Sequence, residues 1–186
     1  MDSSFLEKII HEFEGFKFLV RNLNASQRLK TLQSSSYNNY LLTGLTKNRI
    51  NDLNQLHQAI RDGRKLNYWR KLLYRYRGNR LCAVAINQVN QLVGFIYFYF
   101  REDEIAKNII HEAFVGVKPE ERGQGIATAL QNYSLDQLSH QHLQGVSGYV
   151  EKNNLASVIV HQRVGYEIKD DPRDPENNYH MYYRLS

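Results

Sequence analysis

The residues best suited to chemistry lie in one short segment, Val115–Leu130, which reads VGVKPEERGQGIATAL. Gly123 and Gly125 lack a Cβ, so the backbone can turn sharply there and a ligand can approach it closely. A helix-forming run follows, and the first N–H groups of a helix have no intrahelical partner and carry a partial positive charge. Arg122 adds a planar cation beside them. The segment therefore predicts a cradle for a phosphate or a pyrophosphate.

This segment differs from two common phosphate-binding patterns. No Gly-Lys-Ser/Thr follows the glycines, as a P-loop requires, and the glycine spacing does not fit the dinucleotide fingerprint. On these residues alone, a plain strand-to-helix junction with glycines that tighten the turn stays an alternative.

The elements that must hold the segment follow from the hydrophobic pattern. Two β-rich runs, LCAVAIN over 81–87 and LVGFIYFYF over 92–100, are separated by a short polar stretch and predict a hairpin. A third β-rich run, NIIHEAFVGV over 108–117, ends before Pro119, which has no N–H to continue a ladder. Beyond it the pattern predicts a helix over 125–140, a strand over 145–150, a helix over 155–163 and a final strand over 179–185.

The first part of the chain is expected to be mostly helical. Residues 3–13 predict a short helix, FKFLV over 16–20 reads as a first strand, and 25–76 has helical character. No internal repeat or linker divides the sequence, so we expect one domain, 1–186, with a mixed α/β sheet.

Composition sets limits on the function. Hydrophobic residues make up 42% and charged residues 23% of the chain, as in a globular protein. No segment approaches the ~20 apolar residues of a membrane span, and Glu7 and Glu12 argue against a secretory signal. Cys82 is the single cysteine, which predicts a reducing, cytoplasmic compartment. His140 and His142 have no converging ligands, so we expect no metal. The net charge of +5 favours polyanionic ligands without identifying one.

The opening segment resembles the acetyl-coenzyme A (acetyl-CoA) motif of the GNAT superfamily of N-acetyltransferases, Gln/Arg-x-x-Gly-x-Gly/Ala. Its three signature positions are filled by Arg122, Gly125 and Ala127. Downstream, NNLASVIVHQRVGYE is similar to a second superfamily segment, Asn-x-x-Ala/Ser-x-x-x-Tyr/His-x-x-x-Gly-Phe/Tyr. Its positions are filled by Asn154, Ser157, His161, Gly165 and Tyr166. The match covers about residues 82–186, and its motif style is closest to the phosphinothricin-type branch.

The resemblance implies the GNAT fold, a mostly antiparallel sheet that is splayed between the Val115 strand and the 145–150 strand. Residues 1–80 would form a variable acceptor-side region, and 81–186 the acetyl-CoA-binding core. The pyrophosphate would lie on the turn amides, and the pantetheine arm would pair with the Val115 strand, where Gly116 marks a bulge. The implied cofactor-binding residues are Phe114, Val115, Gly116, Val117, Arg122, Gly123, Gln124, Gly125, Ile126, Ala127, Thr128, Asn154 and Ser157. For Asn154, a simple helix N-cap is the alternative or an additional role.

The implied reaction moves an acetyl group from acetyl-CoA to a primary amine by direct attack in a ternary complex. An alkyl amine has a pKa of about 10.4, so a base must remove its proton. The resemblance gives this role to Glu112; a salt bridge to an arginine or a solvent-facing position is the alternative. Glu112, Phe114 and Gly116 would share a face unless a bulge intervenes, and His111 would face the other way as a structural residue.

The leaving thiolate also needs a proton. Most of the superfamily supplies it from a tyrosine, and His161 occupies that position here, similar to a variant in the phosphinothricin-like branch. A neutral histidine is a weaker donor than an imidazolium. His161 therefore either donates the proton or orients the thiol or the acceptor.

The acceptor is expected to be an amine of a small molecule or an amino acid. The alternatives are a protein amine, N-terminal or lysine, and a non-catalytic domain that binds CoA. Tyr37 and Tyr40 are placed by the resemblance near the acceptor pocket. The acidic segment 169–178 either attracts a cationic amine or is an ordinary loop. The basic, aromatic run 68–80 reads as a helix face more readily than as a nucleic-acid contact. The oligomeric state is open, with a homodimer among the options.

Overall fold

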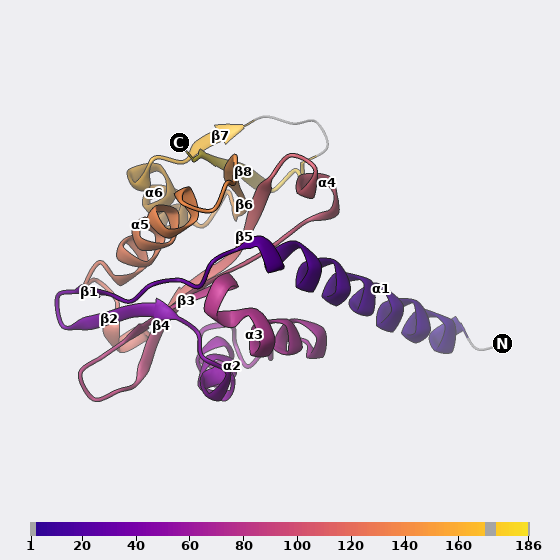
Figure 1. Cartoon of the computed structure of the whole chain (residues 1–186), viewed down its shortest axis with the longest axis horizontal. Helices are drawn as coiled ribbons and strands as arrows, with labels where there is room; N and C mark the ends of the chain where they lie inside the picture. Colours follow the sequence, from indigo (N-terminus) through magenta and orange to yellow (C-terminus); the bar gives the residue numbers. More distant parts are fainter. Residues whose placement is uncertain (1–2, 170–173, 186) are drawn as a thin grey trace.

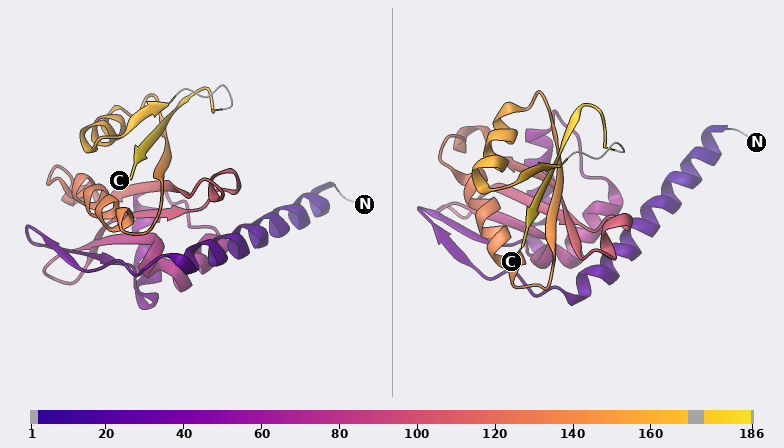
Figure 2. Two further views of the ribbon diagram at one scale, coloured as in Figure 1. Left: turned by 45° about the horizontal axis from the view of Figure 1, so that its top comes forward. Right: turned by 90° about the horizontal axis from the view of Figure 1, so that it is seen from above.

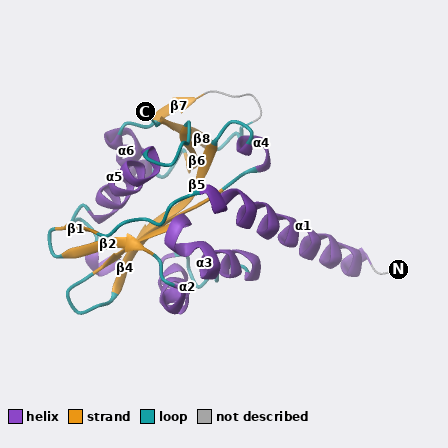
Figure 3. Cartoon of the chain, viewed as in Figure 1, coloured by secondary structure: helices purple, strands orange, loops and turns teal. Residues whose placement is uncertain are grey.

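A computed structural model describes residues 3–169 and 174–185. These residues form one eight-stranded sheet in the order β1-β2-β3-β4-β5-β6-β8-β7 (Figure 3). All neighbouring strands are antiparallel except β5 and β6, which are parallel. The strands are β1 (Ser35–Tyr37), β2 (Tyr40–Gly44), β3 (Cys82–Ile86), β4 (Leu92–Tyr99), β5 (Ile109–Val117), β6 (Gly145–Glu151), β7 (Glu167–Lys169) and β8 (Asn178–Arg184).

Helices cover both faces of the sheet (Figures 1 and 2). They are α1 (Ser3–Ala25), α2 (Ile50–Ile60), α3 (Tyr68–Leu81), α4 (Glu102–Ile105), α5 (Ile126–Ser139) and α6 (Leu155–Val164). Gly94 of β4 faces Ile126 of α5, whereas the ring of the next residue, Phe95, lies against His57 of α2. Because neighbouring residues of a strand point to opposite faces, α2 and α5 lie on opposite sides of the sheet.

The central strands β3 and β4 explain why the sequence reads as continuous apolar runs. Every residue of β3 is buried, and so is β4 from Leu92 to Phe98. A strand covered on both faces needs apolar side chains at successive positions rather than at alternate ones. The predicted hairpin is confirmed, as are the predicted helices and strands from 108 onward.

Strand β5 carries a β-bulge at a different place from the one expected. Tyr97 of β4 pairs with Phe114 and the next residue, Phe98, pairs with Glu112, so Ala113 is the extra residue. Gly116 pairs regularly with Phe95. The expectation of a bulge at Gly116 is therefore wrong. Because the bulge intervenes, Glu112 and Phe114 face opposite sides of the sheet.

The parallel pair β5–β6 opens partway along its length, as the fold expectation requires. Four residue pairs join the strands, from Ile109↔Gly145 to Glu112↔Gly148. Strand β5 then continues to Val117 and β6 to Glu151 without pairing to each other. The two strand ends therefore diverge and leave backbone edges free between them.

Two N-terminal predictions are wrong. The segment 16–20 lies inside helix α1, where Phe18 and Leu19 face the protein, instead of forming a strand. The part of the chain around 35–44, expected to be helical, forms the β1–β2 hairpin. Its turn uses Asn38 at a φ of 48°, a left-handed conformation that asparagine tolerates.

Helix α1 extends away from the sheet toward the N-terminus (Figure 1). Its protruding part exposes apolar side chains along one side, namely Leu6, Ile9, Ile10, Phe13 and Phe16. Even so, within 3–169 and 174–185 no helix combines the length and apolarity that crossing a bilayer would need.

Candidate active site

A cavity of about 710 Å³ lies where β5 and β6 diverge. Its walls come from the β5 segment 112–117, the β6 segment 148–151, the start of α6 and the α2–α3 loop. It is lined by ten of the predicted site residues, namely Glu112, Phe114, Val115, Gly116, Val117, Arg122, Ala127, Asn154, Ser157 and His161. The fold thus brings the two sequence motifs together in one cleft.

The remaining predicted residues form the turn between β5 and α5. Gly123 and Gly125 both adopt a φ of 78°, a left-handed conformation that favours glycine. Gly125 is the N-cap of α5, so the N–H groups of the first turn, to which Ala127 and Thr128 belong, lack intrahelical partners. Ile126 is buried against Gly94 and anchors the helix. The turn therefore has the conformation of an anion cradle.

The β1–β2 hairpin supports this turn. The Tyr40 hydroxyl donates to Glu121 Oε2 at 2.7 Å and lies 2.6 Å from Gln124 Oε1. The Tyr37 hydroxyl donates to the Gln124 carbonyl at 3.3 Å. Neither tyrosine lines the cavity, and both contact the β5–α5 turn. No local sequence signal could have indicated this contact, because it joins segments far apart in the chain.

Glu112 and His161 meet on the face of the sheet covered by α5 and α6. His161 Nε2 lies 3.0 Å from Glu112 Oε1, and both residues are buried, with 3% and 5% of their surfaces exposed. Gln131 of α5 donates to the same oxygen at 3.3 Å, and the Tyr166 hydroxyl donates to Oε2 at 2.8 Å. Glu112 is therefore paired with a histidine, and it neither forms the salt bridge to an arginine nor faces the solvent, which were the alternative expectations. Sequence reasoning gave no role to Gln131 or Tyr166.

The contacts of His161 define where its protons lie. Nδ1 is 2.8 Å from the Ser157 carbonyl, which only accepts, so Nδ1 carries a hydrogen. Burial disfavours the imidazolium, but the hydrogen bond and the charge of Glu112, with the Ser157 carbonyl, outweigh it and raise the pKa of His161. His161 Nε2 lies 3.0 Å from both Glu112 Oε1 and the Gln131 side-chain nitrogen.

Helix α6 positions His161 through both of its ends. The Asn154 side chain accepts from the Ser157 N–H at 3.2 Å, which confirms the N-cap. Gly165, at a φ of 107°, ends the helix as predicted, with its N–H bonded to the His161 carbonyl. The chain then turns so that Tyr166 reaches Glu112.

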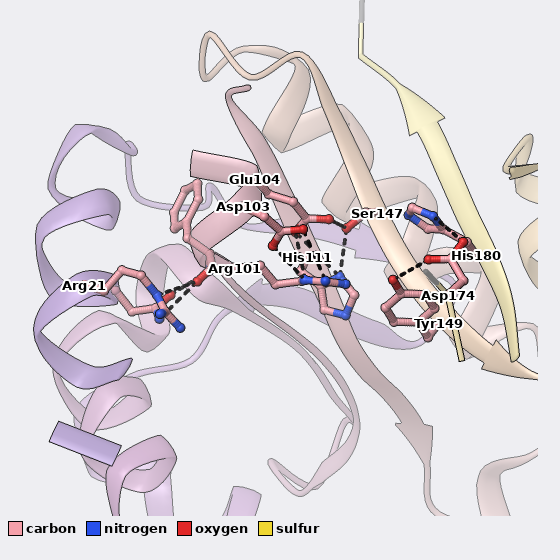
Figure 4. Close-up of polar contacts among 11 residues, drawn as sticks. Arg21, Arg101, Asp103, Glu104, His111, Ser147, Tyr149, Asp174 and His180 are labelled. Carbon is pink, nitrogen blue, oxygen red and sulfur yellow. Dashed lines mark hydrogen bonds and ion pairs between the residues drawn. The ribbon is translucent and has the colours of Figure 1, made fainter. Parts of the chain in front are cut away.

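His111 and Glu112 are neighbours on β5 and point to opposite sides of the sheet, as expected. Figure 4 shows the polar contacts of His111. Its Nδ1 lies 2.8 Å from Ser147 Oγ, and that hydroxyl donates to Glu104 Oε1 at 2.6 Å. Burial lowers the pKa of His111 to about 3, so the ring is neutral. Because the Ser147 proton points to Glu104 rather than to the histidine, this is not the arrangement of a hydrolytic triad.

A neighbouring group ties the last loop to β6 (Figure 4). The Tyr149 hydroxyl donates to Asp174 Oδ1 at 2.7 Å, and His180 Nδ1 lies 3.1 Å from Asp174 Oδ2. The Asp174 carboxylate is therefore engaged within the protein instead of free to attract an amine. Of the other acidic residues of this segment, Glu176 is exposed, and Asp170 and Asp171 lie outside the described residues.

The basic, aromatic run 68–80 forms α3, which packs on the protein along one side and exposes Tyr68, Arg75 and Tyr76 on the other. The Arg70 guanidinium lies 5.6 Å from the Phe18 ring and 4.9 Å from the Tyr99 ring. Tyr74 is buried and donates to the Phe98 carbonyl at 3.2 Å. These contacts support the helix-face interpretation.

The α2–α3 loop supplies a cavity wall that sequence reasoning missed. Arg61, Asp62 and Arg64 line the cavity together with Ile60 at the end of α2. In the described parts of the chain, no group of three or more His, Cys, Asp or Glu residues is arranged to hold a metal ion.

The chain that forms this cleft matches a known protein family. Residues 50–166 match the family model described as the acetyltransferase (GNAT) family, and this match spans more than half of the chain. The chain therefore belongs to the GNAT acetyltransferase family.

Two curated relatives share part of the sequence. Mycothiol acetyltransferase from Paenarthrobacter aurescens is 32% identical over 84 residues, which cover 45% of this chain and 26% of the relative. The enzyme of the same name from Renibacterium salmoninarum is 27% identical over 84 residues, 45% of this chain and 25% of the relative. The chain thus spans about a quarter of the length of these relatives.

Solved structures share the fold. Arabidopsis thaliana NAA60 in complex with acetyl-CoA has a TM-score of 0.67 at 17% identity, covering 78% of this chain and 99% of that one. Arabidopsis thaliana Naa50 in complex with the bisubstrate analogue CoA-Ac-MVNAL has a TM-score of 0.63 at 20% identity, covering 78% and 98%. At these identities the likeness concerns the fold.

Proposed function

We propose that the protein transfers the acetyl group of acetyl-CoA to a primary amine of a small molecule or an amino acid, by direct attack within a ternary complex. The observation that carries this proposal is a single cleft that joins the Arg122–Ala127 turn to the Glu112–His161 pair. When bound, acetyl-CoA supplies an acetyl group activated as a thioester. The side chains around it must bind the donor, bind the amine and move protons.

The β5–α5 turn fits the diphosphate of CoA. A Cβ at Gly123 would meet nothing within 4 Å, so the turn is open on that side, and Arg122 lies beside it. The amides of Gly123–Ala127 and the Arg122 guanidinium would hold the phosphates. Gln124 would keep the turn in place through Tyr40.

The free edge of β5 fits an extended ligand. Beyond Glu112 this edge has no strand partner on the β6 side, so the backbone of 114–117 is available to pair with the pantetheine amides. Asn154 uses its side-chain oxygen for the cap, and its NH₂ group would bind the same arm. Ser157 lines the cavity one helical turn further on.

We assign proton handling to the Glu112–His161 pair. Glu112 Oε1 would take a proton from the acceptor amine, directly or through a water. His161 Nε2, with its raised pKa, would give one to the sulfur that leaves. Both residues line the cavity, which supports catalysis over a domain that only binds CoA. Because a glutamate and a histidine occupy these two positions, we propose a mechanism similar to that of the phosphinothricin-type branch.

We also propose which part of the chain binds the acceptor and in which compartment the protein works. Within one domain, residues 1–80 would supply the acceptor side, since the α2–α3 loop forms that cavity wall. Cys82 is buried and free, which supports a reducing, cytoplasmic compartment.

The test is a panel of amines, amino acids and short peptides incubated with acetyl-CoA while free thiol is measured. Thiol release above the background rate with a small amine or amino acid supports the proposal. Release only with peptides would favour protein acetylation. CoA binding by calorimetry with background thiol release throughout would favour the non-catalytic alternative.

A further inference from the structure

Two arginines of the α2–α3 loop face the cavity. Arg61 and Arg64 make no side-chain hydrogen bond or ion pair with any residue in 3–169 or 174–185. Each guanidinium carries five N–H donors in a fixed fork that matches a carboxylate or a phosphate. Arg61 is half-buried and Arg64 is exposed, so both guanidiniums are free to bind an anionic group of a ligand in the cavity.

The position of Arg61 separates it from the proposed diphosphate cradle. Its guanidinium lies 4.9 Å from the centre of the Phe114 ring, over the middle of β5. Arg122 contacts the Val117 carbonyl at 3.4 Å, at the end of the strand. Three residues of a strand span about 10 Å, so the two cations serve different ends of the cavity. Phe114 is two residues from Glu112 along β5, and the bulge turns the two side chains to opposite faces, so Arg61 lines the same cavity from the face that α2 covers.

The loop is held in place by a buried histidine. His57 Nδ1 lies 2.8 Å from the Arg64 carbonyl, and the ring packs 5.9 Å from that of Phe114. The Arg61 N–H bonds to the His57 carbonyl at 3.0 Å, and the Arg64 N–H bonds to the Arg61 carbonyl at 2.9 Å. Both arginines are therefore set on an ordered turn, which lowers the entropy lost when they bind a ligand.

The charges of this wall select among amines. A primary amine is itself cationic at neutral pH, so two unpaired guanidiniums repel a simple alkyl amine or a polyamine. Asp62 and Glu151 also line the cavity. Cations and carboxylates together fit a molecule that carries both signs of charge.

We infer that the acceptor is a small primary amine that also carries an anionic group, and that Arg61 and Arg64 bind this group. The inference rests on the proposed function and narrows its substrate class. The anionic group is a carboxylate, as in an amino acid, or a phosphate. Arg61 and Arg64 are specificity residues in this scheme, and proton transfer stays with Glu112 and His161.

The experiment compares amines in matched pairs with the full chain and acetyl-CoA, measuring thiol release. The pairs are lysine with cadaverine, phenylalanine with phenethylamine, and phosphoethanolamine with ethanolamine. We expect the anionic member of at least one pair to have a kcat/KM about tenfold or more above its partner without the anion, because a charged hydrogen bond typically contributes that much. The pair that responds distinguishes carboxylate from phosphate.

Variants test whether Arg61 and Arg64 are the residues that bind the anionic group. Arg61→Gln and Arg64→Gln should raise the KM for the anionic acceptor about 10- to 100-fold and leave the KM for acetyl-CoA unchanged. Arg75→Gln, at an exposed position of α3, is the matched control and should change neither. Thermal unfolding of each variant checks that the fold is kept.

The outcomes separate this inference from the proposed function. If amines without an anionic group, or a C-terminally amidated neutral peptide, react as well as their anionic counterparts, the function holds and the inference fails. A rise in KM for acetyl-CoA alone in Arg61→Gln would also overturn the inference, since Arg61 would then bind the cofactor. If no amine releases thiol, the proposed function fails and the inference fails with it.

Discussion

Acid should destabilise the protein through His111, by an amount set by the difference between the pKa of this residue in the folded and unfolded states. The ring is buried and bonded to Ser147, and burial lowers its pKa to about 3, against about 6.5 in an unfolded chain. Below pH 6.5 the unfolded chain binds a proton that the folded protein refuses. The stability that the neutral ring contributes is therefore complete above pH 6.5 and is lost progressively as the pH falls toward 3.

The magnitude follows from the pKa difference. Each pH unit between the two values costs about 1.4 kcal/mol, so the loss is about 2 kcal/mol at pH 5 and at most about 5 kcal/mol near pH 3. A domain of this kind has about 5–15 kcal/mol of unfolding free energy, so a loss of 2 kcal/mol is easily measured.

The assay compares urea unfolding of the natural protein and of His111→Asn at pH 7, 6 and 5. Asparagine can still donate to Ser147 Oγ but does not titrate, so the stability advantage of the natural protein should shrink by about 2 kcal/mol between pH 7 and 5. His161, whose raised pKa gives it the opposite pH dependence, is the same in both proteins and cancels. His140→Asn, at a side chain that is 72% exposed, is the control. Parallel pH dependences of the natural protein and His111→Asn would refute the reasoning.

Three further predictions concern the proposed base Glu112, the glycine turn before α5 and the buried Cys82. Glu112→Gln should lower turnover about 10²-fold or more at neutral pH, with partial recovery at high pH where the amine is already neutral; an unchanged, pH-independent rate would remove Glu112 as the base. Gly125→Ala places a Cβ 2.5 Å from the Tyr37 hydroxyl and should weaken CoA binding at least tenfold by calorimetry. Gly63→Ala has a similar φ of 83° but open space around it, so it should keep CoA affinity, and equal losses in the two variants would contradict the cradle. Cys82 is buried, and burial raises the pKa of its thiol, so it should react with a thiol reagent only on unfolding; fast labelling of the native protein would contradict this burial.

The sequence was informative wherever a segment is buried on both faces or carries a motif. Strands β3 and β4 are apolar at successive positions, a pattern typical of short strands that are covered on both sides. The largely apolar segment 16–20 is too short for its pattern to distinguish a strand from one face of a helix. In the structure it continues the helix α1 that begins before it. Strand β1 and the turn that follows it contain only serine, tyrosine and asparagine, so this half of the hairpin carries little hydrophobic periodicity.

The site was predictable in its motifs and not in its long-range contacts. The two segments that carry Arg122 and His161 could be placed in one cleft because each has its own residue pattern. Tyr40 and Arg61 belong to no pattern, and their roles depend on which distant segment packs beside them. The bulge at Ala113 depends on the register with β4, which a single strand sequence does not contain.

The short ladder between β5 and β6 has a consequence for how the protein responds to ligands. Only the four pairs from Ile109 to Glu112 join these strands, so the part formed by β6, β8 and α6 is tethered to the rest of the sheet along one end (Figure 2). A CoA molecule that forms hydrogen bonds with the free edges of both β5 and β6 would hold the two parts of the sheet together. At a hundred times its dissociation constant it would add about 2.7 kcal/mol to the free energy of unfolding. The melting temperature would then report donor binding before any acceptor has been identified.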